Sequence, residues 1–406
     1  MRILAIHNYH RKGSASGDDQ VFKSETALLE KYGNKVIRYT VSNDEYDKSG
    51  VIGKIHSVIG MLWSVKHYKS IQQLIKKEKP DIVHVHTFFP LLSPSILYAA
   101  KRMQVPVVAT LHDTRFICPC ATSLRGTKIC NKCGDGHYLR MCRYGCFKDS
   151  RIQSLAVAII FKFHRLRKSF YKQIDRYICL NNNQIKLLKR IGFDKSKIIK
   201  KYNFVPDADL NLSDETYEGL PERYVVFYGR IGKEKGIKIL TEAWNDLEIP
   251  LVVMGGGPLE EDFKKWADKN SNVYFMGYTE HEKCLNIVKN SEFVVFPSIW
   301  YEGCSMVEIE AMSLGKGIIA TDLGFSKEAV MDGYNGYKFP LGDISEFKKK
   351  ISELWDSSQR CIELGANARK EYEEKYEPKD NYMDLMRIYK STLRGKANAY
   401  RNKRNR

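Results

Sequence analysis

The sequence predicts an α/β protein with two domains, each built on a doubly wound parallel sheet. The chain has 406 residues, which is more than one ordinary domain holds and enough for two domains that each bury a core. Short β-branched runs alternate with segments of helical periodicity, a pattern typical of parallel sheets covered by helices. A polar, acidic stretch from residue 203 to Pro221 interrupts this alternation, which then starts again. We therefore expect domains at 1–205 and 206–375.

Composition limits the class of protein without choosing a function. A hydrophobic content of 43% fits a globular chain, and the apolar run at residues 1–8 is too short for a signal peptide and predicts a strand. No stretch approaches the roughly 20 apolar residues that cross a bilayer. We therefore expect a cytoplasmic protein whose ten cysteines are thiols. The net charge of +18 favours nucleic acid, anionic membrane or phosphorylated substrates as partners.

In the first half, histidines follow the predicted strands. Strands are expected at 2–6, 36–40, 82–86, 107–110 and 177–180. His84 and His86 share one face of a strand, but no third metal ligand follows them at a suitable spacing. His112 ends the next strand, at the carboxyl edge where open α/β sheets bind ligands. After the first strand, Gly17 precedes Asp18 in a loop without the G-x-G-x-x-G pattern, so this loop is weak evidence for a phosphate contact.

The periodicity fails between residues 116 and 147, which we interpret as an insertion rich in cysteine. Cys130 and Cys133 form a C-x2-C pair, which together with two further thiolates can close a tetrahedral zinc site. The alternative is that these cysteines are small buried hydrophobic residues.

Helical spacing returns from residue 151 to residue 172. Apolar side chains share one face and basic side chains another: Leu155, Ile159, Phe163, Leu166 and Phe170 against Lys162, Arg165, Lys168 and Lys172. Such a helix either lies on an anionic membrane surface or packs its apolar face on the core.

The second half repeats the α/β pattern and carries more charged residues at its strand ends. Strands are expected at 224–228, 251–254, 273–275, 293–296 and 317–321. After the first of these, Arg230 and Lys235 lie in a loop between Gly229 and Gly236. Glycine permits a tight turn there, and the two cations are suited to phosphate oxygens.

The stretch from residue 293 to residue 315 predicts a strand, a loop and a helix. Ser305 and Glu308 have the S-x-x-E spacing of a capping box, so we expect the helix to begin at Met306. Its N-terminus, preceded by Gly303, would stabilise an anion such as a diphosphate. Glu302 and Glu310 lie a little over two turns apart and can accept hydrogen bonds from sugar hydroxyls. The alternative is that both are solvated acids that complement the helix dipole.

These motifs resemble the retaining glycosyltransferases of the GT-B fold, family 4, with their E-x7-E signature. The matching elements are Pro297-Ser298, Glu302-Gly303 and Glu310-Ala311-Met312, the Gly229–Gly236 loop, Gly255-Gly256-Gly257-Pro258 and Phe275-Met276-Gly277. The resemblance implies two Rossmann-like domains facing across a cleft. It also implies a C-terminal helix at 376–395 that returns to the first domain, which leaves a basic tail at 396–406.

The resemblance also implies roles for individual residues. The residues expected to act in catalysis are His112, Arg230, Lys235 and Glu302. Those expected to bind the donor nucleotide sugar are Gly17, Arg230, Lys235, Gly277, Gly303, Cys304, Ser305, Met306 and Glu310. Cations replace a catalytic metal, so no cofactor is expected for transfer, which proceeds on the front face with retention. Cysteines near the corresponding places in the resembled subfamily add Cys118 and Cys146 to Cys130 and Cys133 as the expected ligands of a structural zinc.

The expected donor is a nucleoside-diphosphate sugar, and the expected acceptor is a glycan, carried on polyprenyl diphosphate, at the inner face of the cell membrane. One rival is a zinc-containing nucleic-acid-binding protein, which the charge favours. This rival leaves the placement of Arg230, Lys235, Glu302 and Glu310 at successive strand ends unexplained, so we expect no nucleic-acid partner. Another rival is a catalytically silent nucleotide-sugar binder.

Overall fold

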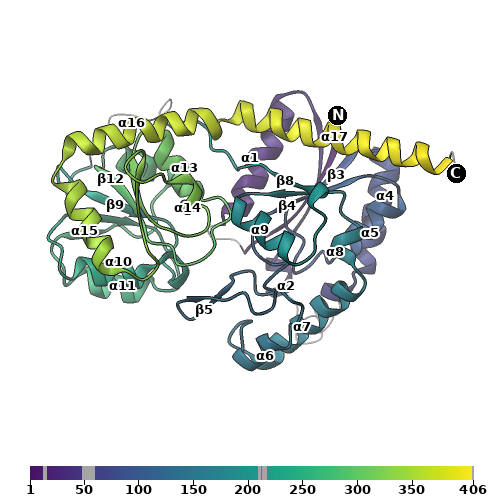
Figure 1. The fold of residues 1–406 in the computed structure, drawn as a ribbon, viewed down its shortest axis with the longest axis horizontal. Helices are drawn as coiled ribbons and strands as arrows, with labels where there is room; N and C mark the ends of the chain where they lie inside the picture. Colours follow the sequence, from purple (N-terminus) through teal and green to yellow (C-terminus); the bar gives the residue numbers. More distant parts are fainter. Residues whose placement is uncertain (12–15, 48–59, 209–211, 213–216, 405–406) are drawn as a thin grey trace. The chain divides into compact units, whose positions relative to one another are not determined.

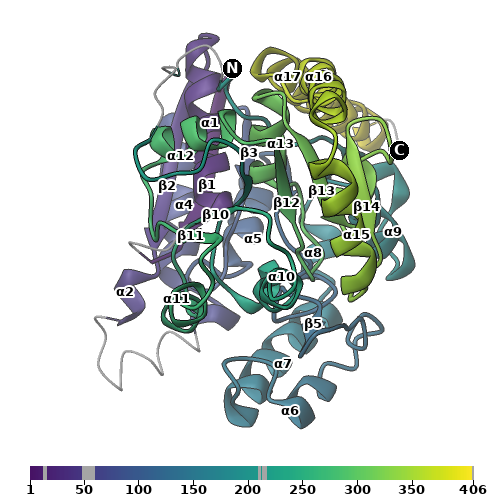
Figure 2. The same ribbon diagram turned by 90° about the vertical axis from the view of Figure 1, so that its left-hand side faces the viewer.

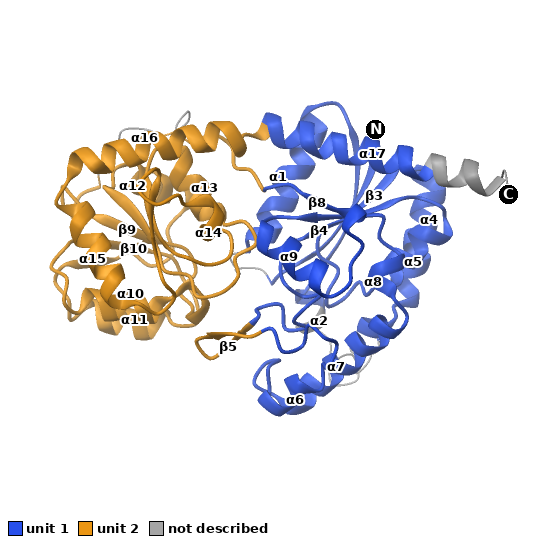
Figure 3. Cartoon of the chain, viewed as in Figure 1, with its two compact units in different colours: residues 1–123, 131–202, 379–406 blue, residues 124–130, 203–378 orange. Residues whose placement is uncertain are grey.

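The computed structural model describes residues 1–11, 16–47, 60–208, 212 and 217–404. The chain divides into two compact units (Figure 3). Unit 1 contains Met1–Ser123, Asn131–Tyr202 and Lys379–Arg406, and unit 2 contains Leu124–Cys130 and Asn203–Pro378. The chain passes from unit 1 to unit 2 between Tyr202 and Asn203, three residues before the predicted domain boundary. The predicted insertion is shared, because its hairpin of β5 (Leu124–Arg125) and β6 (Lys128–Ile129) belongs to unit 2.

Unit 1 is built on a six-stranded parallel sheet of order β2-β1-β3-β4-β7-β8. Figure 1 labels its strands β3, β4 and β8. Its strands are β1 (Arg2–Tyr9), β2 (Lys35–Ser42), β3 (Ile82–Val85), β4 (Val107–Leu111), β7 (Arg176–Cys179) and β8 (Ile198–Lys200). Its helices are α1 (Gly17–Lys31), α2 (Asp44–Asp47), α4 (Val65–Glu78), α5 (Ser95–Arg102), α6 (Arg140–Tyr144), α7 (Arg151–Leu166), α8 (Ser169–Lys172), α9 (Asn182–Arg190) and α17 (Pro378–Arg404). The prediction missed β8, whose three residues are too few for periodicity to show.

Alternation along the strands divides the unit 1 core into two layers. One layer packs side chains of the sheet against α1 and α17: Ile3, Ile82, Val108 and Ile178 against Leu29, Leu385, Met386, Ile388 and Tyr389. The neighbouring strand residues point the other way, into the larger core that includes residues of α4, α5 and α7. Because His84 is two residues from Ile82 and Thr110 is two from Val108, both side chains point to the α1 and α17 face.

Unit 2 has a second parallel sheet, of order β11-β10-β9-β12-β13-β14; Figure 2 shows β12, β13 and β14 side by side. Its strands are β9 (Val225–Tyr228), β10 (Leu251–Met254), β11 (Val273–Phe275), β12 (Phe293–Phe296), β13 (Gly317–Thr321) and β14 (Gly336–Phe339). Its helices are α10 (Ile237–Trp244), α11 (Glu260–Ala267), α12 (His281–Lys289), α13 (Met306–Ser313), α14 (Ser326–Ala329), α15 (Ile344–Trp355) and α16 (Ser358–Lys375). Each sheet is doubly wound, as predicted.

Helix α17 continues through most of the segment that we expected to be a tail. It extends to Arg404, and Leu385 and Tyr389 on it are buried in unit 1. The prediction that a tail starts at residue 396 was therefore wrong, because no helix-breaking residue follows Gly395 and the helix continues. Among the described residues, no helix has both the length and the apolar character needed to span a bilayer.

Helix α7 does not bury the apolar face that its periodicity predicted. Leu155, Ile159 and Leu166 are exposed, whereas Ser154, Ala158, Phe161 and His164 face the core. Arg165 also departs from the prediction, since it is half-buried and donates to Gly134 O (3.4 Å) and Tyr138 Oη (3.5 Å). The small side chains of Ser154 and Ala158 let the helix approach the core closely, which leaves the larger apolar residues outside.

Candidate active site

In unit 2, the charged residues of the predicted site gather where the strand order reverses. β9 lies between β10 and β12, and this reversal is the point at which open α/β sheets bind ligands. Lys235 follows β9 and Glu302 follows β12. Lys235 Nζ lies 2.6 Å from Glu302 Oε1, and the two side chains are only 18% and 9% exposed. The sequence prediction that both residues belong to one site is consistent with this contact.

Backbone packing and neighbouring side chains fix the Lys235–Glu302 pair. Gly236 has φ +76°, and a Cβ there would lie 1.8 Å from Pro297 O, so only glycine lets the β9 and β12 loops meet this closely. The hydroxyl of Ser298 donates to Glu302 Oε1 (2.8 Å). The Lys235 ammonium also lies 5.7 Å from the Trp300 ring centroid. The cation is thus held in place before any ligand binds.

Helix α13 begins beside this pair, at the residue that the sequence predicted. Ser305 caps it by accepting from Glu308 N (3.3 Å), and Gly303, Cys304 and Met306 lie around this start. Cys304 is buried, and its carbonyl accepts from Asn203 Nδ2 (3.3 Å). The first-turn N–H groups of a helix carry partial positive charge, so they add to the field of Lys235.

The remaining predicted donor residues of unit 2 lie around the same strand ends. Arg230 is about half exposed, and its Nε lies 3.6 Å from Glu234. Glu310 points from α13 to His281, whose Nε2 lies 3.0 Å from Glu310 Oε1, and this hydrogen bond raises the pKa of His281. Gly277 follows β11, and its carbonyl accepts from Gly255 N (2.7 Å).

Two residues of this region were not predicted as site residues. The sequence around His281 did not mark it as a site residue, because its contact with Glu310 depends on the order of the strands in the sheet. Glu308 was predicted only as a capping residue, yet its side chain is fully buried, and burial raises its pKa to about 8. Glu308 is thus a neutral acid next to the charged pair, and its place on the inner face of α13 could have been read from its spacing to Met312.

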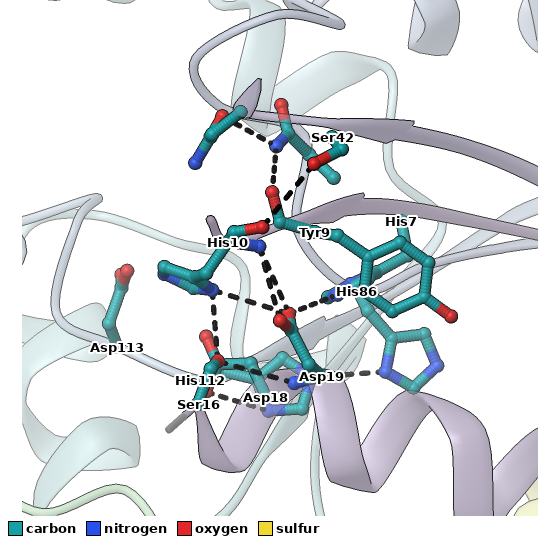
Figure 4. Close-up of polar contacts among 12 residues, drawn as sticks. His7, Tyr9, His10, Ser16, Asp18, Asp19, Ser42, His86, His112 and Asp113 are labelled. Carbon is teal, nitrogen blue, oxygen red and sulfur yellow. Dashed lines mark hydrogen bonds and ion pairs between the residues drawn. The ribbon is translucent and has the colours of Figure 1, made fainter. Parts of the chain in front are cut away.

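In unit 1, His112 belongs to a cluster of histidines and acids (Figure 4). It follows β4 and lines a pocket with Asp113, Arg115 and Phe116. His112 Nε2 lies 3.0 Å from His86 Nδ1, and His86 Nε2 lies 3.1 Å from Glu25 Oε1. Burial lowers the pKa of His86 to about 4 and holds the pKa of His112 well below its usual range. Both imidazoles are therefore neutral.

The start of α1 supplies the acids of this cluster. Gly17 is the first residue of α1, and Ser16 caps the helix. Asp19 lies 2.8 Å from His7 Nε2 and also accepts from His10 N (3.2 Å). Burial and the nearby Asp113 raise the pKa of Asp18 to about 7. Gly17 therefore starts the helix that positions both aspartates, while the predicted phosphate contact at Gly17 stays a prediction.

Glu25, His84 and His86 are the one set of three side chains, among the residues that the structure describes, whose ligand atoms all lie within 4.8 Å of one another. The sequence showed no third ligand for the two histidines, because Glu25 comes from α1. A cation already meets this carboxylate: Lys201 Nζ lies 3.0 Å from Glu25 Oε2. His84 is engaged at both nitrogens, by Thr110 Oγ1 (2.8 Å) and Tyr389 Oη (2.7 Å). We interpret the set as a charge network.

The predicted zinc ligands do not all lie in one unit. Cys118, Cys133 and Cys146 belong to unit 1, whereas Cys130 is the last residue of the unit 2 hairpin. Cys120 is the thiol next to Cys118, and their hydrogen bond lowers the pKa of Cys118 to about 6. No three of the cysteines form a preassembled group among the described residues, and the zinc stays a prediction.

Two family models match consecutive parts of the chain. The model for Glycosyltransferase Family 4 matches residues 29–209, and the model for Glycosyl transferases group 1 matches residues 212–371. The fold and both matches define a sugar-transferring enzyme of two Rossmann-like domains. The chain belongs to the GT-B glycosyltransferases of the family 4 type, as its motifs predicted.

Curated relatives and solved structures agree with this family. O-antigen chain mannosyltransferase C of Escherichia coli is 21% identical over 98% of this chain and 100% of its own length. UDP-Gal:alpha-D-GlcNAc-diphosphoundecaprenol alpha-1,3-galactosyltransferase of Escherichia coli is 25% identical over 81% of each chain. HepE of Anabaena, solved in complex with UDP, shares the fold with a TM-score of 0.65 at 16% identity, over 96% of this chain and 100% of its own.

Proposed function

We propose that this protein transfers a sugar, with retention, from a nucleoside-diphosphate sugar to a lipid-linked glycan during the biosynthesis of a cell-surface polysaccharide. The pair of Lys235 and Glu302 carries the proposal, since it places one cation and one hydroxyl acceptor at the strand reversal of unit 2. The names of the two Escherichia coli relatives, an O-antigen chain mannosyltransferase and a galactosyltransferase for a diphosphoundecaprenol-linked sugar, support the polysaccharide and the lipid-linked acceptor.

In this proposal, Lys235, Arg230 and the first N–H groups of α13 bind the donor diphosphate. They stabilise the negative charge that develops as the bond between the anomeric carbon and the phosphate oxygen breaks. Glu302 and Glu310 accept hydrogen bonds from donor hydroxyls. The cations supply the positive charge that a divalent metal provides in other transferases, so we propose transfer without a metal. His112 of unit 1 contacts the donor sugar.

The partners of the two carboxylates support front-face transfer. Glu302 Oε1 already meets Lys235 and Ser298, and Glu310 meets His281, which favours positioning roles over nucleophilic attack. The acceptor oxygen therefore bonds to the anomeric carbon on the face that the diphosphate leaves. The acceptor proton passes to the departing phosphate oxygen, so no protein base is required and the configuration is retained.

A thermal-shift panel of nucleotide sugars and their nucleoside diphosphates tests the donor site. A donor at about 100 times its dissociation constant should stabilise the folded protein by roughly 2.7 kcal/mol. The Lys235→Ala variant should lose this shift. Lys238→Ala is the matched control, because Lys238 is 77% exposed and pairs with Glu242 on α10. Absence of a shift with every donor, or an equal shift in Lys235→Ala, would refute the donor site.

A lipid-linked acceptor requires the enzyme to reach a membrane, and we propose that the outer face of α6 and α7 docks on an anionic bilayer at the cytoplasmic side. This face, the docking face, carries exposed large apolar residues: Leu139, Tyr144, Ile152, Leu155, Ile159 and Leu166. The segment 139–172 also contains nine Lys or Arg and one acidic residue, Asp149. Apolar side chains that enter the headgroup region beside surface cations are typical of interfacial helices.

Flotation with lipid vesicles tests the docking face. Each Lys near an anionic surface contributes about 1 kcal/mol, so changing Lys162, Lys168 and Lys172 to Gln should weaken binding by about 150-fold. Changing three exposed lysines near α11 (Lys264, Lys265 and Lys269) to Gln is the matched control. Binding that is independent of anionic lipid, or equal loss in both triple variants, would refute membrane docking by this face.

A further inference from the structure

In the histidine cluster of unit 1, a buried carboxylate and two imidazoles form a series of close polar contacts that ends at the pocket. Glu25 Oε1 lies 3.1 Å from His86 Nε2, and His86 Nδ1 lies 3.0 Å from His112 Nε2. His86 and His112 both line the pocket, where His112 lies beside Asp113 and Arg115 and follows β4, whose carboxyl edge can meet a ligand. Glu25 is fully buried on α1.

The charge at the start of this series is fixed. Burial alone would raise the pKa of Glu25, but the Lys201 ammonium holds it well below its usual range. Lys201 is itself buried, and its Nζ lies 3.0 Å from Glu25 Oε2. Glu25 is therefore an anion, and it can only accept hydrogen bonds.

The anion determines which nitrogen of each imidazole carries the proton. Neutral His86 places its proton on Nε2, because the Glu25 anion, 3.1 Å away, attracts the N–H dipole even without the alignment of a hydrogen bond, and His86 is left with a lone pair on Nδ1. That lone pair requires a donor, so His112 places its proton on Nε2. His112 is then left with a lone pair on Nδ1. Asp18 Oδ1 lies 3.9 Å from this nitrogen, beyond hydrogen-bond reach.

We propose that Glu25 and His86 are positioning residues that hold His112 as the Nε2–H tautomer, so that its Nδ1 accepts a hydrogen bond from a hydroxyl of the bound sugar. This inference rests on the proposed function for the role of the sugar, whereas the tautomer itself follows from unit 1 alone. The site thereby selects a sugar with a hydroxyl that can donate a hydrogen bond to His112 Nδ1. A sugar that is deoxygenated or O-methylated at this position cannot donate that hydrogen bond.

His84 provides a built-in comparison. It lies on the same strand face, and its Nδ1 is 3.2 Å from the same Glu25 oxygen. Its other nitrogen contacts Thr110 instead of His112. Loss of His84 therefore disturbs the same carboxylate without breaking the series that ends at His112.

Nuclear magnetic resonance of the full chain labelled with ¹⁵N-histidine tests the tautomer. Long-range ¹H–¹⁵N correlations, assigned with a His112→Gln variant, should show His112 protonated at Nε2 and bare at Nδ1. In His86→Phe the signals should move towards the opposite tautomer or a mixture. In His84→Gln they should stay as in the parent. Thermal unfolding of each variant confirms that it is folded.

Three results would overturn the proposal: a proton on Nδ1 of His112 in the parent, an unchanged tautomer in folded His86→Phe, or an equal change in both variants. The tautomer of His112 measured in the parent protein tests the proposal even if His86→Phe does not fold. With a donor identified by thermal shift, His86→Phe should lower kcat/KM by about tenfold, the size of one hydrogen bond, and an unchanged kcat/KM would remove the functional role. If no donor binds, the proposed function fails while the tautomer result stands.

Discussion

Replacing Lys235 by Ala probes the charge on which the donor site depends. Lys235 Nζ lies 2.6 Å from Glu302 and is largely shielded from solvent. A charge pair 4 Å apart is worth about 4 kcal/mol at an effective dielectric of about 20. Loss of one preorganised charge donor typically costs about 100-fold to 1,000-fold in kcat. We therefore expect Lys235→Ala to lower kcat by at least about 100-fold in a transfer assay that follows nucleoside diphosphate release.

A variant that combines Lys235→Ala with Glu302→Gln separates the effect of the Lys235 charge itself from its role as a partner of Glu302. Glu302→Gln keeps the shape of the side chain and removes its charge. If Lys235 and Glu302 act as one unit, the rate of the double variant should exceed the product of the two single effects by a coupling of about 1 kcal/mol or more. Lys238→Ala should behave as the parent. Parent-like turnover in Lys235→Ala, or equal losses in Lys235→Ala and Lys238→Ala, would refute the assignment.

Three further predictions concern stability and metal content. Because burial raises the pKa of Glu308 from 4.5 to about 8, this group should lower the free energy of unfolding by about 1.4 kcal/mol per pH unit between roughly pH 5 and 8. Urea unfolding of Glu308→Gln should lack this component, and parallel pH profiles would contradict it. Protein purified without chelator should contain about one zinc per chain by elemental analysis, lost on changing both Cys133 and Cys146 to Ser; zinc retained by that variant would exclude the site. A stop after Glu377 should unfold unit 1 in limited proteolysis, whereas a stop after Ala397 should not.

Local sequence signals predicted the unit 2 site because its residues follow strands directly. Spacing placed Arg230 and Lys235 after one strand and Glu302 after another, and the Ser305 cap fixed where α13 begins. These features depend on backbone conformation within a few residues, which side-chain type and glycine position determine. The contact between Glu310 and His281 depends on where separate elements pack, so the sequence did not show it.

The charge network of unit 1 could not be predicted from local sequence patterns. Alternation placed His84 and His86 on one strand face, yet Glu25 and Lys201 come from segments far from them in sequence. Their meeting depends on the strand order β2-β1-β3-β4-β7-β8, which periodicity does not contain. Helix α7 shows the same limit, because periodicity identifies its two faces but not which one the core accepts.

Helix α17 makes the order of synthesis matter for this protein. Leu385 and Tyr389 complete the core layer that covers Ile3 and Ile82, although unit 1 otherwise ends at Tyr202 and resumes only at Lys379. At about 5–20 residues per second, a ribosome spends roughly ten to thirty seconds on the intervening chain. During that time the first sheet lacks the cover that Leu385 and Tyr389 provide, so we expect the nascent chain to expose part of this apolar face until its last helix emerges. For the same reason, an isolated unit 1 should be made by joining residues 1–202 to α17 through a short linker.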